Sequence, residues 1–225
     1  MKKILFPIVL LGVVSLLVYW AINSYFLVDD VKVATTEKEQ PVQHSKIQNG
    51  DIIFQTSTSN QSKAIQLATK SKYSHTGIIY ENEDQYFVYE AVQPVQLTHL
   101  QAWINRGEDG HYVIKRLANA DQVLTPATLA KMKKIGEKFS GKPYDIYFEW
   151  SDDKIYCSEL VWKIYKEAAN IEIGQLEKLS DFDLSHNIVK SKMKERYGDN
   201  IPLNEKVISP AAMFTSDQLI LVTEK

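Results

Sequence analysis

Cysteine is the scarcest functional side chain in this sequence: the 225 residues contain one, Cys157. A single cysteine excludes an internal disulfide, so the fold has to rely on its core. The chain also lacks an excess of charge of either sign, since 26 basic and 28 acidic residues leave a formal net charge of −2. Without a large electrostatic field, nucleic acid is not expected as a partner.

Metal-binding patterns are absent as well. The sequence has no H-E-x-x-H motif, and His99, His111 and His186 have no partners at metal-ligand spacing. We therefore expect no metal and no other cofactor. There is no internal repeat either, and a length of 225 residues suits one ordinary domain plus an appendage.

The long hydrophobic run of the chain lies at its N-terminus. Two lysines precede roughly two dozen residues with almost no polar interruption, which at about 1.5 Å per helical residue is enough to cross a bilayer. The run is long and has no A-x-A-like end, so residues 1–30 are predicted to be an uncleaved membrane anchor, with a cleaved signal for secretion as the alternative. Positive charge before the run and acidic residues after it place the remainder outside the cytoplasm, in the periplasm or cell envelope.

A globular domain is predicted over residues 47–225, after a polar linker at 31–46. Short strands are expected near 52–54, 74–80, 85–92 and 110–117, the middle two forming a hairpin around a four-residue loop at 81–84. Helices are expected at 59–71, between the N-cap Thr125 and Gly141, which lies beyond the end, around Cys157, and after Ser209-Pro210 before a last strand. Strands grouped in one block with helices around them indicate an α+β fold.

The predicted hairpin brings an imidazole to a carboxylate. With the loop at 81–84, counting back along the strands pairs His75 with Glu90, on the same face and about 4.5–5.5 Å apart at Cβ. A slip of one residue would put Glu90 on the other face. A histidine held by a carboxylate has a fixed tautomer and a raised proton affinity, which suits a general base that serves a thiol.

The lone cysteine occupies the first turn of its predicted helix. Leu160, Val161, Ile164 and Ala168 share a helical face with Cys157, so the sulfur should lie on the side that docks against the sheet. The positive end of the helix dipole and free backbone N–H groups favour a thiolate there. The same N–H groups could receive the negative charge of a carbonyl oxygen under attack. These residues therefore supply a nucleophile, a base, an orienting group and an oxyanion site.

Six segments carry a resemblance to one known family. In order along the chain they are NGDIIFQ, YSHTGIIY, VYEA, GKPYD, YCSELVWKIY and ISPAAMFTSDQL. Together they resemble the circularly permuted branch of the NlpC-type papain-like cysteine hydrolases, or YiiX-like group. The likeness extends over roughly residues 47–222 and implies a permuted papain-like fold, with an antiparallel sheet packed against helices. The histidine and glutamate precede the cysteine in the chain, as the permuted branch implies.

The resemblance also implies residue roles. Cys157 matches the nucleophile, His75 the general acid/base, and Glu90 the third, orienting member. A tyrosine that assists the oxyanion is implied too, and both Tyr156, beside the nucleophile, and Tyr144, in the segment GKPYD, are candidates.

The function expected from these features is an exported or membrane-anchored cysteine hydrolase that cleaves an amide or ester bond through an acyl-thioester on Cys157. The resemblance implies an acyl-amide, a lipid or a peptidoglycan-type substrate. A lipid acyltransferase of the same mechanism is an alternative, because both reactions share the thioester. A non-catalytic envelope binding module of the same fold is another.

Overall fold

The computed structural model describes residues 47–225, so the predicted anchor (1–30) and linker (31–46) lie outside the described residues. Within the described part, no helix combines the length and the apolar character that a membrane span requires.

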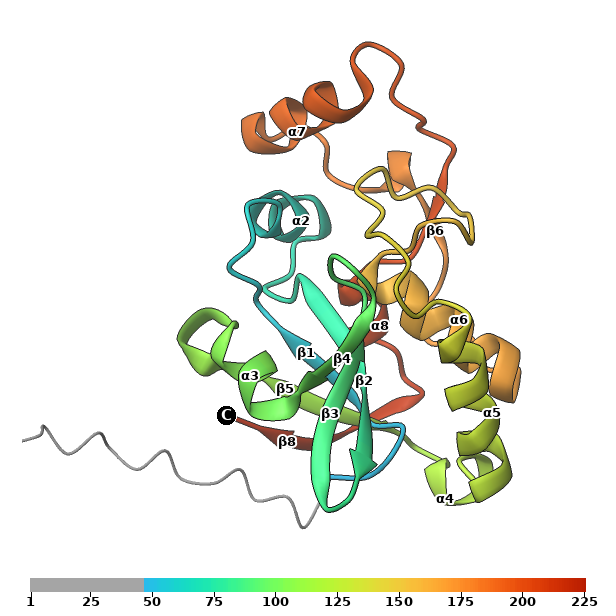
Figure 1. The fold of residues 1–225 in the computed structure, drawn as a ribbon. Coiled ribbons are helices and arrows are strands. Elements are labelled where there is room, and N and C mark those ends of the chain that lie inside the picture. Colours follow the sequence, from blue (N-terminus) through green and yellow to red (C-terminus); the bar gives the residue numbers. More distant parts are fainter. Residues whose placement is uncertain (1–46) are drawn as a thin grey trace, which may run out of the picture. The chain divides into compact units, whose positions relative to one another are not determined.

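The centre of the described domain is a six-stranded antiparallel sheet with the strand order β4-β3-β2-β1-β5-β8 (Figure 1). A separate two-stranded sheet pairs β6 with β7. The strands are β1 (Ile52–Gln55), β2 (His75–Asn82), β3 (Gln85–Glu90), β4 (Gln96–His99), β5 (Val113–Leu117), β6 (Glu177–Lys178), β7 (Lys206–Val207) and β8 (Leu219–Glu224).

Seven α-helices surround this sheet among residues 47–225, which agrees with the expected antiparallel sheet packed against helices. Helices α2 and α7 lie together at one end of the sheet, and α5 and α6 lie beside each other along it (Figure 1). The helices are α2 (Ser62–Thr69), α3 (Leu100–Asn105), α4 (Ala120–Val123), α5 (Pro126–Glu137), α6 (Cys157–Ala169), α7 (Asn187–Tyr197) and α8 (Pro210–Phe214).

Helix α5 begins as the sequence predicts. The Thr125 hydroxyl accepts a hydrogen bond from the Thr128 backbone N–H at 3.2 Å, and Pro126 occupies the first turn, where a missing N–H costs nothing. The helix ends at Glu137, a few residues before Gly141, which the sequence predicts to lie just beyond its end. Further turns then lead to Gly141, whose φ of +76° is a left-handed conformation that glycine adopts readily.

The hairpin of β2 and β3 differs from the prediction in its turn. Tyr80 pairs with Phe87 and Asn82 with Gln85, so the loop is the two-residue turn Glu83-Asp84 rather than four residues at 81–84. Both turn residues have positive φ, as a type I′ turn requires, and this turn matches the twist of the strands. The register therefore shifts by two residues, an even number, which keeps every side chain on its predicted face.

Gly77 allows β3 to pass close to β2 at the end of this hairpin. A methyl group at this position would clash with the Val88 side chain, lie 2.8 Å from the carbonyl oxygen of Tyr89, and contact Glu90. We expect Gly77→Ala to lower the free energy of unfolding by about 1–3 kcal/mol, because β3 would have to move away. Urea unfolding followed by circular dichroism would measure this change.

Gly141→Ala is the matched control for Gly77→Ala. An added Cβ there meets nothing within 4 Å, so the substitution tests only the left-handed backbone. The close approach of β3 predicts that Gly77→Ala, and not Gly141→Ala, also lowers any activity that depends on Glu90. Equal behaviour of the two variants would contradict this explanation.

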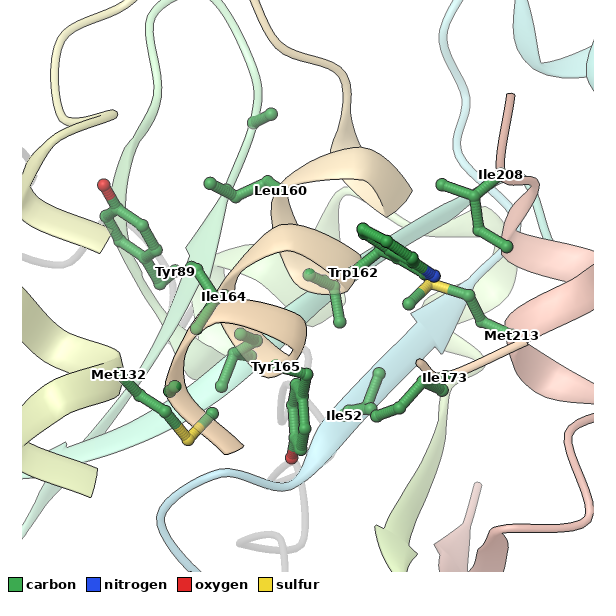
Figure 2. Packing of buried hydrophobic residues seen from close by; sticks show 14 of the residues in the cluster. Ile52, Tyr89, Met132, Leu160, Trp162, Ile164, Tyr165, Ile173, Ile208 and Met213 are labelled. Carbon is green, nitrogen blue, oxygen red and sulfur yellow. The ribbon is translucent and has the colours of Figure 1, made fainter. Parts of the chain in front are cut away.

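Helix α6 is the most buried helix of the domain. All of its first nine residues are buried, because its apolar face packs on the sheet and the opposite side is covered by other segments. Figure 2 shows Leu160 and Ile164 of this helix on the side of Tyr89, from β3, and Met132, from α5. Burial of this helix fixes the position of its first residue, Cys157, relative to β2 and β3.

Candidate active site

The three residues predicted to carry chemistry lie together at the ends of three elements. His75 is the first residue of β2, Glu90 is the last residue of β3, and Cys157 is the first residue of α6. Because β2 and β3 are antiparallel neighbours, the start of one and the end of the other lie at the same end of the hairpin. Helix α6 packs on β2 and brings the cysteine to this point.

The start of α6 is fixed by its own sequence. Tyr156 is the N-cap, with an extended backbone, and its N–H donates to Glu159 Oε2 at 3.4 Å, as in a capping box. Glu159 is fully buried, and its other carboxylate oxygen lies 2.8 Å from Lys163 Nζ one turn later. This acidic side chain therefore caps the first turn, and burial, opposed by Lys163, raises its pKa to about 8.

The Cys157 thiol interacts with the His75 imidazole and with the backbone N–H groups of Thr76 and Ser158. Burial alone would raise the pKa of the thiol, since its residue is only 3% exposed. The hydrogen bond and positive charge of His75, with the two N–H donors, outweigh burial and hold this pKa below its ordinary value. The site therefore favours the thiolate.

His75 links the thiol to the carboxylate. Its Nε2 lies 2.6 Å from Glu90 Oε2, which leaves Nδ1 for the thiol. With the register shifted by two, these residues are diagonal rather than directly opposite, yet a glutamate side chain spans that separation. Burial opposes the charged imidazole, but its hydrogen bonds to Cys157 and Glu90 and their charges raise its pKa to about 9.

Glu90 is fully buried and holds three donors. Its Oε1 accepts from the Thr98 hydroxyl at 2.6 Å and from Arg106 Nη2, while Oε2 faces His75. Burial would raise the pKa of this carboxyl, but the hydrogen bonds and the charges of His75 and Arg106 lower it below its usual value. The sequence does not identify Thr98 and Arg106 as site residues. They lie in β4 and at the end of α3, in a part of the sequence without a clear pattern.

Trp103 covers the imidazole ring. It is fully buried in α3, and its ring lies 5.7 Å from that of His75 with an interplanar angle of 23°. Such stacking fixes the orientation of the ring and keeps water from that face. Nothing in the sequence pattern links Trp103 to His75, since a buried tryptophan is ordinarily a core residue.

Of the two tyrosine candidates, Tyr144 is the one whose hydroxyl reaches the thiol. Ile155 pairs with Tyr144 in an isolated parallel bridge just before α6, which places the phenol beside Cys157. The Tyr144 hydroxyl accepts from Gln61 Nε2 at 2.9 Å, so its own proton is free to point at the sulfur. Arg196 Nη2 in turn donates to Gln61 Oε1 at 2.7 Å, which fixes the orientation of the amide.

Tyr156 has a different partner. Its hydroxyl accepts from the backbone N–H of Ile208 at 3.0 Å, and its ring packs edge-on against Phe148 with centroids 5.1 Å apart. Burial raises the pKa of both phenols well above the ordinary value, so both stay protonated. Tyr156 therefore forms part of the wall near Cys157, while Tyr144 faces the sulfur.

Two pockets reach this constellation. Cys157 lines one pocket, between α2, α7 and the start of α6. His75 lines the other, beside β1 and the end of β3. Tyr144 and Gln61 line both pockets, so they mark where the two meet. The nucleophile and the base are thus each accessible from a different side of Tyr144.

Comparison with known proteins identifies the family of the chain. The sequence matches the family model described as permuted papain-like amidase enzyme, YaeF/YiiX, C92 family, over residues 46–223. It is 50% identical over 178 residues to the uncharacterized protein YiiX of Escherichia coli (strain K12), an alignment that covers 79% of this chain and 87% of that protein. The crystal structure of metalloprotein yiiX from Escherichia coli O157:H7 is 49% identical, with a TM-score of 0.76, and the match covers 80% of this chain and 98% of the other. The chain therefore belongs to the YaeF/YiiX family of permuted papain-like amidases.

Proposed function

We propose that this family member is a cysteine hydrolase that cleaves an amide or ester bond through an acyl-thioester on Cys157. The observation that carries the proposal is the placement of the Cys157 thiol beside His75, whose Nε2 lies 2.6 Å from Glu90 Oε2. This is the arrangement in which a thiolate is activated by a base that a third group orients. Order along the chain is irrelevant to such chemistry.

The first half of the reaction forms the thioester. The Cys157 thiolate attacks the carbonyl carbon, a carbon–sulfur bond forms, and the carbonyl π electrons move to its oxygen. When the intermediate collapses, the bond to the leaving group breaks and protonated His75 gives its proton to the leaving nitrogen or oxygen. Water, deprotonated by neutral His75, then attacks the thioester, releases the acid and restores the thiolate.

The negative oxygen of each tetrahedral intermediate needs donors. The backbone N–H of Cys157 stands in the first turn of α6, where it has no partner within the helix. The Tyr144 hydroxyl, held by Gln61, supplies a second donor beside the sulfur. We assign the oxyanion to these two groups, because donors positioned in advance stabilise developing charge most effectively.

A metal has no evident place in this mechanism. The Escherichia coli O157:H7 relative is described as a metalloprotein. Among residues 47–225, however, no group of three or more histidine, cysteine, aspartate or glutamate side chains is placed to hold an ion. The Glu90 oxygens are already engaged by His75, Thr98 and Arg106. The described residues therefore do not fit a metal centre, and no step is assigned to one.

The experiment that tests the proposal is a search for the thioester. The full-length protein would be mixed with acyl-amides, lysophospholipids and cell-wall peptides, quenched in acid, and analysed by mass spectrometry. We expect an added acyl mass on the peptide containing Cys157, together with release of the free acid. An acyl group passed to an added amine or alcohol instead of water would indicate a transferase. Turnover without any adduct, equal in Cys157→Ala, would refute the mechanism.

We also propose that the domain acts outside the cytoplasm, tethered by residues 1–30. The proposal is supported by the apolar run and its flanking charges. Mass spectrometry of the mature chain from the membrane fraction would test it. An intact N-terminus in the membrane would support the anchor, and a chain that starts after the apolar run would indicate a cleaved signal.

Glu90→Gln should weaken the base without removing it. The amide keeps the size of the side chain but loses the negative charge that favours the imidazolium, so the pKa of His75 should fall. We expect kcat/KM to fall about 10- to 100-fold, the value of a hydrogen bond to a charged group, and the alkaline limb of its pH profile to move to lower pH. Steady-state kinetics from pH 5 to 10 would measure both.

Glu81→Gln is the matched control on the same hairpin, because its side chain is exposed and lies at the far end of β2. Its pH profile should equal that of the wild-type protein. If Glu90→Gln retained both the rate and the alkaline limb, Glu90 would have no orienting role.

A further inference from the structure

Lys163 is a buried lysine on the second turn of α6, and no step of the proposed mechanism uses it. The residue is 8% exposed, although lysine is almost never buried unless it is paired. An ammonium group has three N–H donors and no acceptor. Three oxygens lie close to Lys163 Nζ: the backbone carbonyl oxygen of Ser151 at 2.6 Å, Asp152 Oδ1 at 2.7 Å and Glu159 Oε1 at 2.8 Å. The acceptors therefore match the donors of this side chain in number.

The three acceptors lie on both sides of the nucleophile along the chain. Two of them precede Cys157, and the third, Glu159, follows it. Lys163 therefore fixes both ends of the short segment 153–158, which contains the nucleophile. Glu159 adds a contact inside this segment, because its Oε2 accepts from the backbone N–H of Tyr156 at 3.4 Å.

Segment 153–158 also holds both groups to which the proposed function assigns the oxyanion. The backbone N–H of Cys157 belongs to it directly. Tyr144 is joined to it through Ile155, which pairs with Tyr144 in the parallel bridge and whose carbonyl oxygen accepts from the Asp145 N–H at 3.2 Å. A displacement of the segment would change the position of each donor relative to the sulfur, and misplacement by about 1 Å can cost about 100-fold in rate.

We propose that Lys163 is a positioning residue, which keeps the Cys157 N–H and the Tyr144 hydroxyl in the geometry that the oxyanion requires. It acts through segment 153–158 and takes no part in the chemistry. The inference rests on the proposed function and adds a residue to it. Because His75 activates the thiol, stabilisation of the oxyanion should depend on Lys163, whereas formation of the thiolate should not.

Two reactions of the same thiol measure these properties separately. p-Nitrophenyl acetate acylates Cys157 through a tetrahedral oxyanion and releases nitrophenolate. Iodoacetamide alkylates the thiolate by displacement of iodide and forms no oxyanion. Stopped-flow absorbance of nitrophenolate, with full-length protein and with Cys157→Ala as the blank, would give the rate constant of acylation. Mass spectrometry of the alkylated protein would give the rate of alkylation as a function of pH.

Lys163→Met removes the ammonium group and keeps a side chain of similar length. We expect it to lower the rate constant of acylation about 10- to 100-fold, because both oxyanion donors are displaced. The rate of alkylation and its pH dependence should stay within about twofold of the wild-type values, because His75 still holds the thiolate.

Asp152→Ala tests the same contact with little risk to folding. The Asp152 side chain is 69% exposed, and its loss removes one of the three acceptors. Acylation should fall several-fold while alkylation stays unchanged. The matched controls are Asp153→Ala, at the exposed neighbouring position, and Lys166→Met, at a partly exposed lysine of the same helix that pairs with Glu172. Both controls should acylate and alkylate at the wild-type rates.

A double-mutant cycle tests whether Lys163 acts through Tyr144. Tyr144→Phe removes one of the two donors, so the position of that residue then no longer affects the oxyanion. Lys163→Met should therefore cost about threefold less in the Tyr144→Phe protein than in the wild-type protein, since changes that share a partner are not additive.

Three results would overturn the inference. They are acylation of both Lys163→Met and Asp152→Ala at the wild-type rate, a parallel fall of acylation and alkylation in both variants, and an equal cost of Lys163→Met with and without the Tyr144 hydroxyl. If Lys163→Met fails to fold, Asp152→Ala decides. None of these results affects the test of the proposed function, which asks whether the wild-type protein forms an acyl-thioester on Cys157.

Discussion

Cys157→Ala should lower kcat/KM by about 10⁴-fold or more on every substrate that the protein hydrolyses. The sulfur supplies the nucleophile of the proposed mechanism, and the neighbouring Ser158 hydroxyl is engaged, since it donates to the carbonyl oxygen of Ile208 at 2.7 Å. Without the thiolate, water activated by His75 would have to attack the substrate itself, a far weaker nucleophile on a less reactive bond than the thioester. Steady-state kinetics with a fluorogenic acyl substrate would measure the loss.

The fold should tolerate this change. Alanine removes one sulfur atom from a residue at the edge of a pocket, so the melting temperature should stay within a few degrees of the wild-type value. Cys157→Ser keeps the size of the side chain and should be nearly as inactive, because a hydroxyl is far harder to ionise than a thiol. Substantial hydrolysis by both variants would show that another residue is the nucleophile.

His75→Ala should have the second-largest effect, a fall in kcat/KM of about 10³-fold or more. Two contributions disappear together. The thiol loses the hydrogen bond and the charge that lower its pKa, and the leaving group loses its proton donor. The space under Trp103 becomes free, so added imidazole should restore part of the activity.

His111→Ala is the matched control for the histidine. His111 is partly exposed and interacts with Lys72 and with Glu224 of β8, and it has no role in the proposed mechanism. Its replacement should leave kcat/KM unchanged, and imidazole should have no effect. If His75→Ala retained activity within tenfold of the wild-type protein, the imidazole would have a structural role only.

The sequence was sufficient to predict those parts of the candidate site that depend on helix periodicity and strand alternation. The first turn of α6 could be identified because Cys157 precedes a strong helical pattern, and the face of Glu90 followed from strand alternation. The predicted loop at 81–84 was wrong. Because the register differs by two residues, each side chain of the hairpin still lies on its predicted face of the sheet. His75 and Glu90 therefore remained together, which a one-residue error would have prevented.

Long-range packing accounts for what the sequence did not predict. Helix α7 was not among the predicted helices, because its surface is largely charged and just Val189 and Met193 are buried. Trp103 and Arg106 reach the site through α3, a short helix without a capping side chain. The choice between Tyr144 and Tyr156 depended on the bridge to Ile155, which no local pattern encodes.

The pH dependence of thiol alkylation tests the central claim, that His75 holds Cys157 as a thiolate, most directly. The thiol pKa is lowered and the pKa of His75 is raised to about 9, so the ion pair should exist above the former and below the latter. Iodoacetamide should react with the native protein near its maximal rate at about pH 7, whereas His75→Ala should need about pH 8.5 or higher. A single titration at or above pH 8.5 in both proteins, or reaction only after unfolding, would contradict the account.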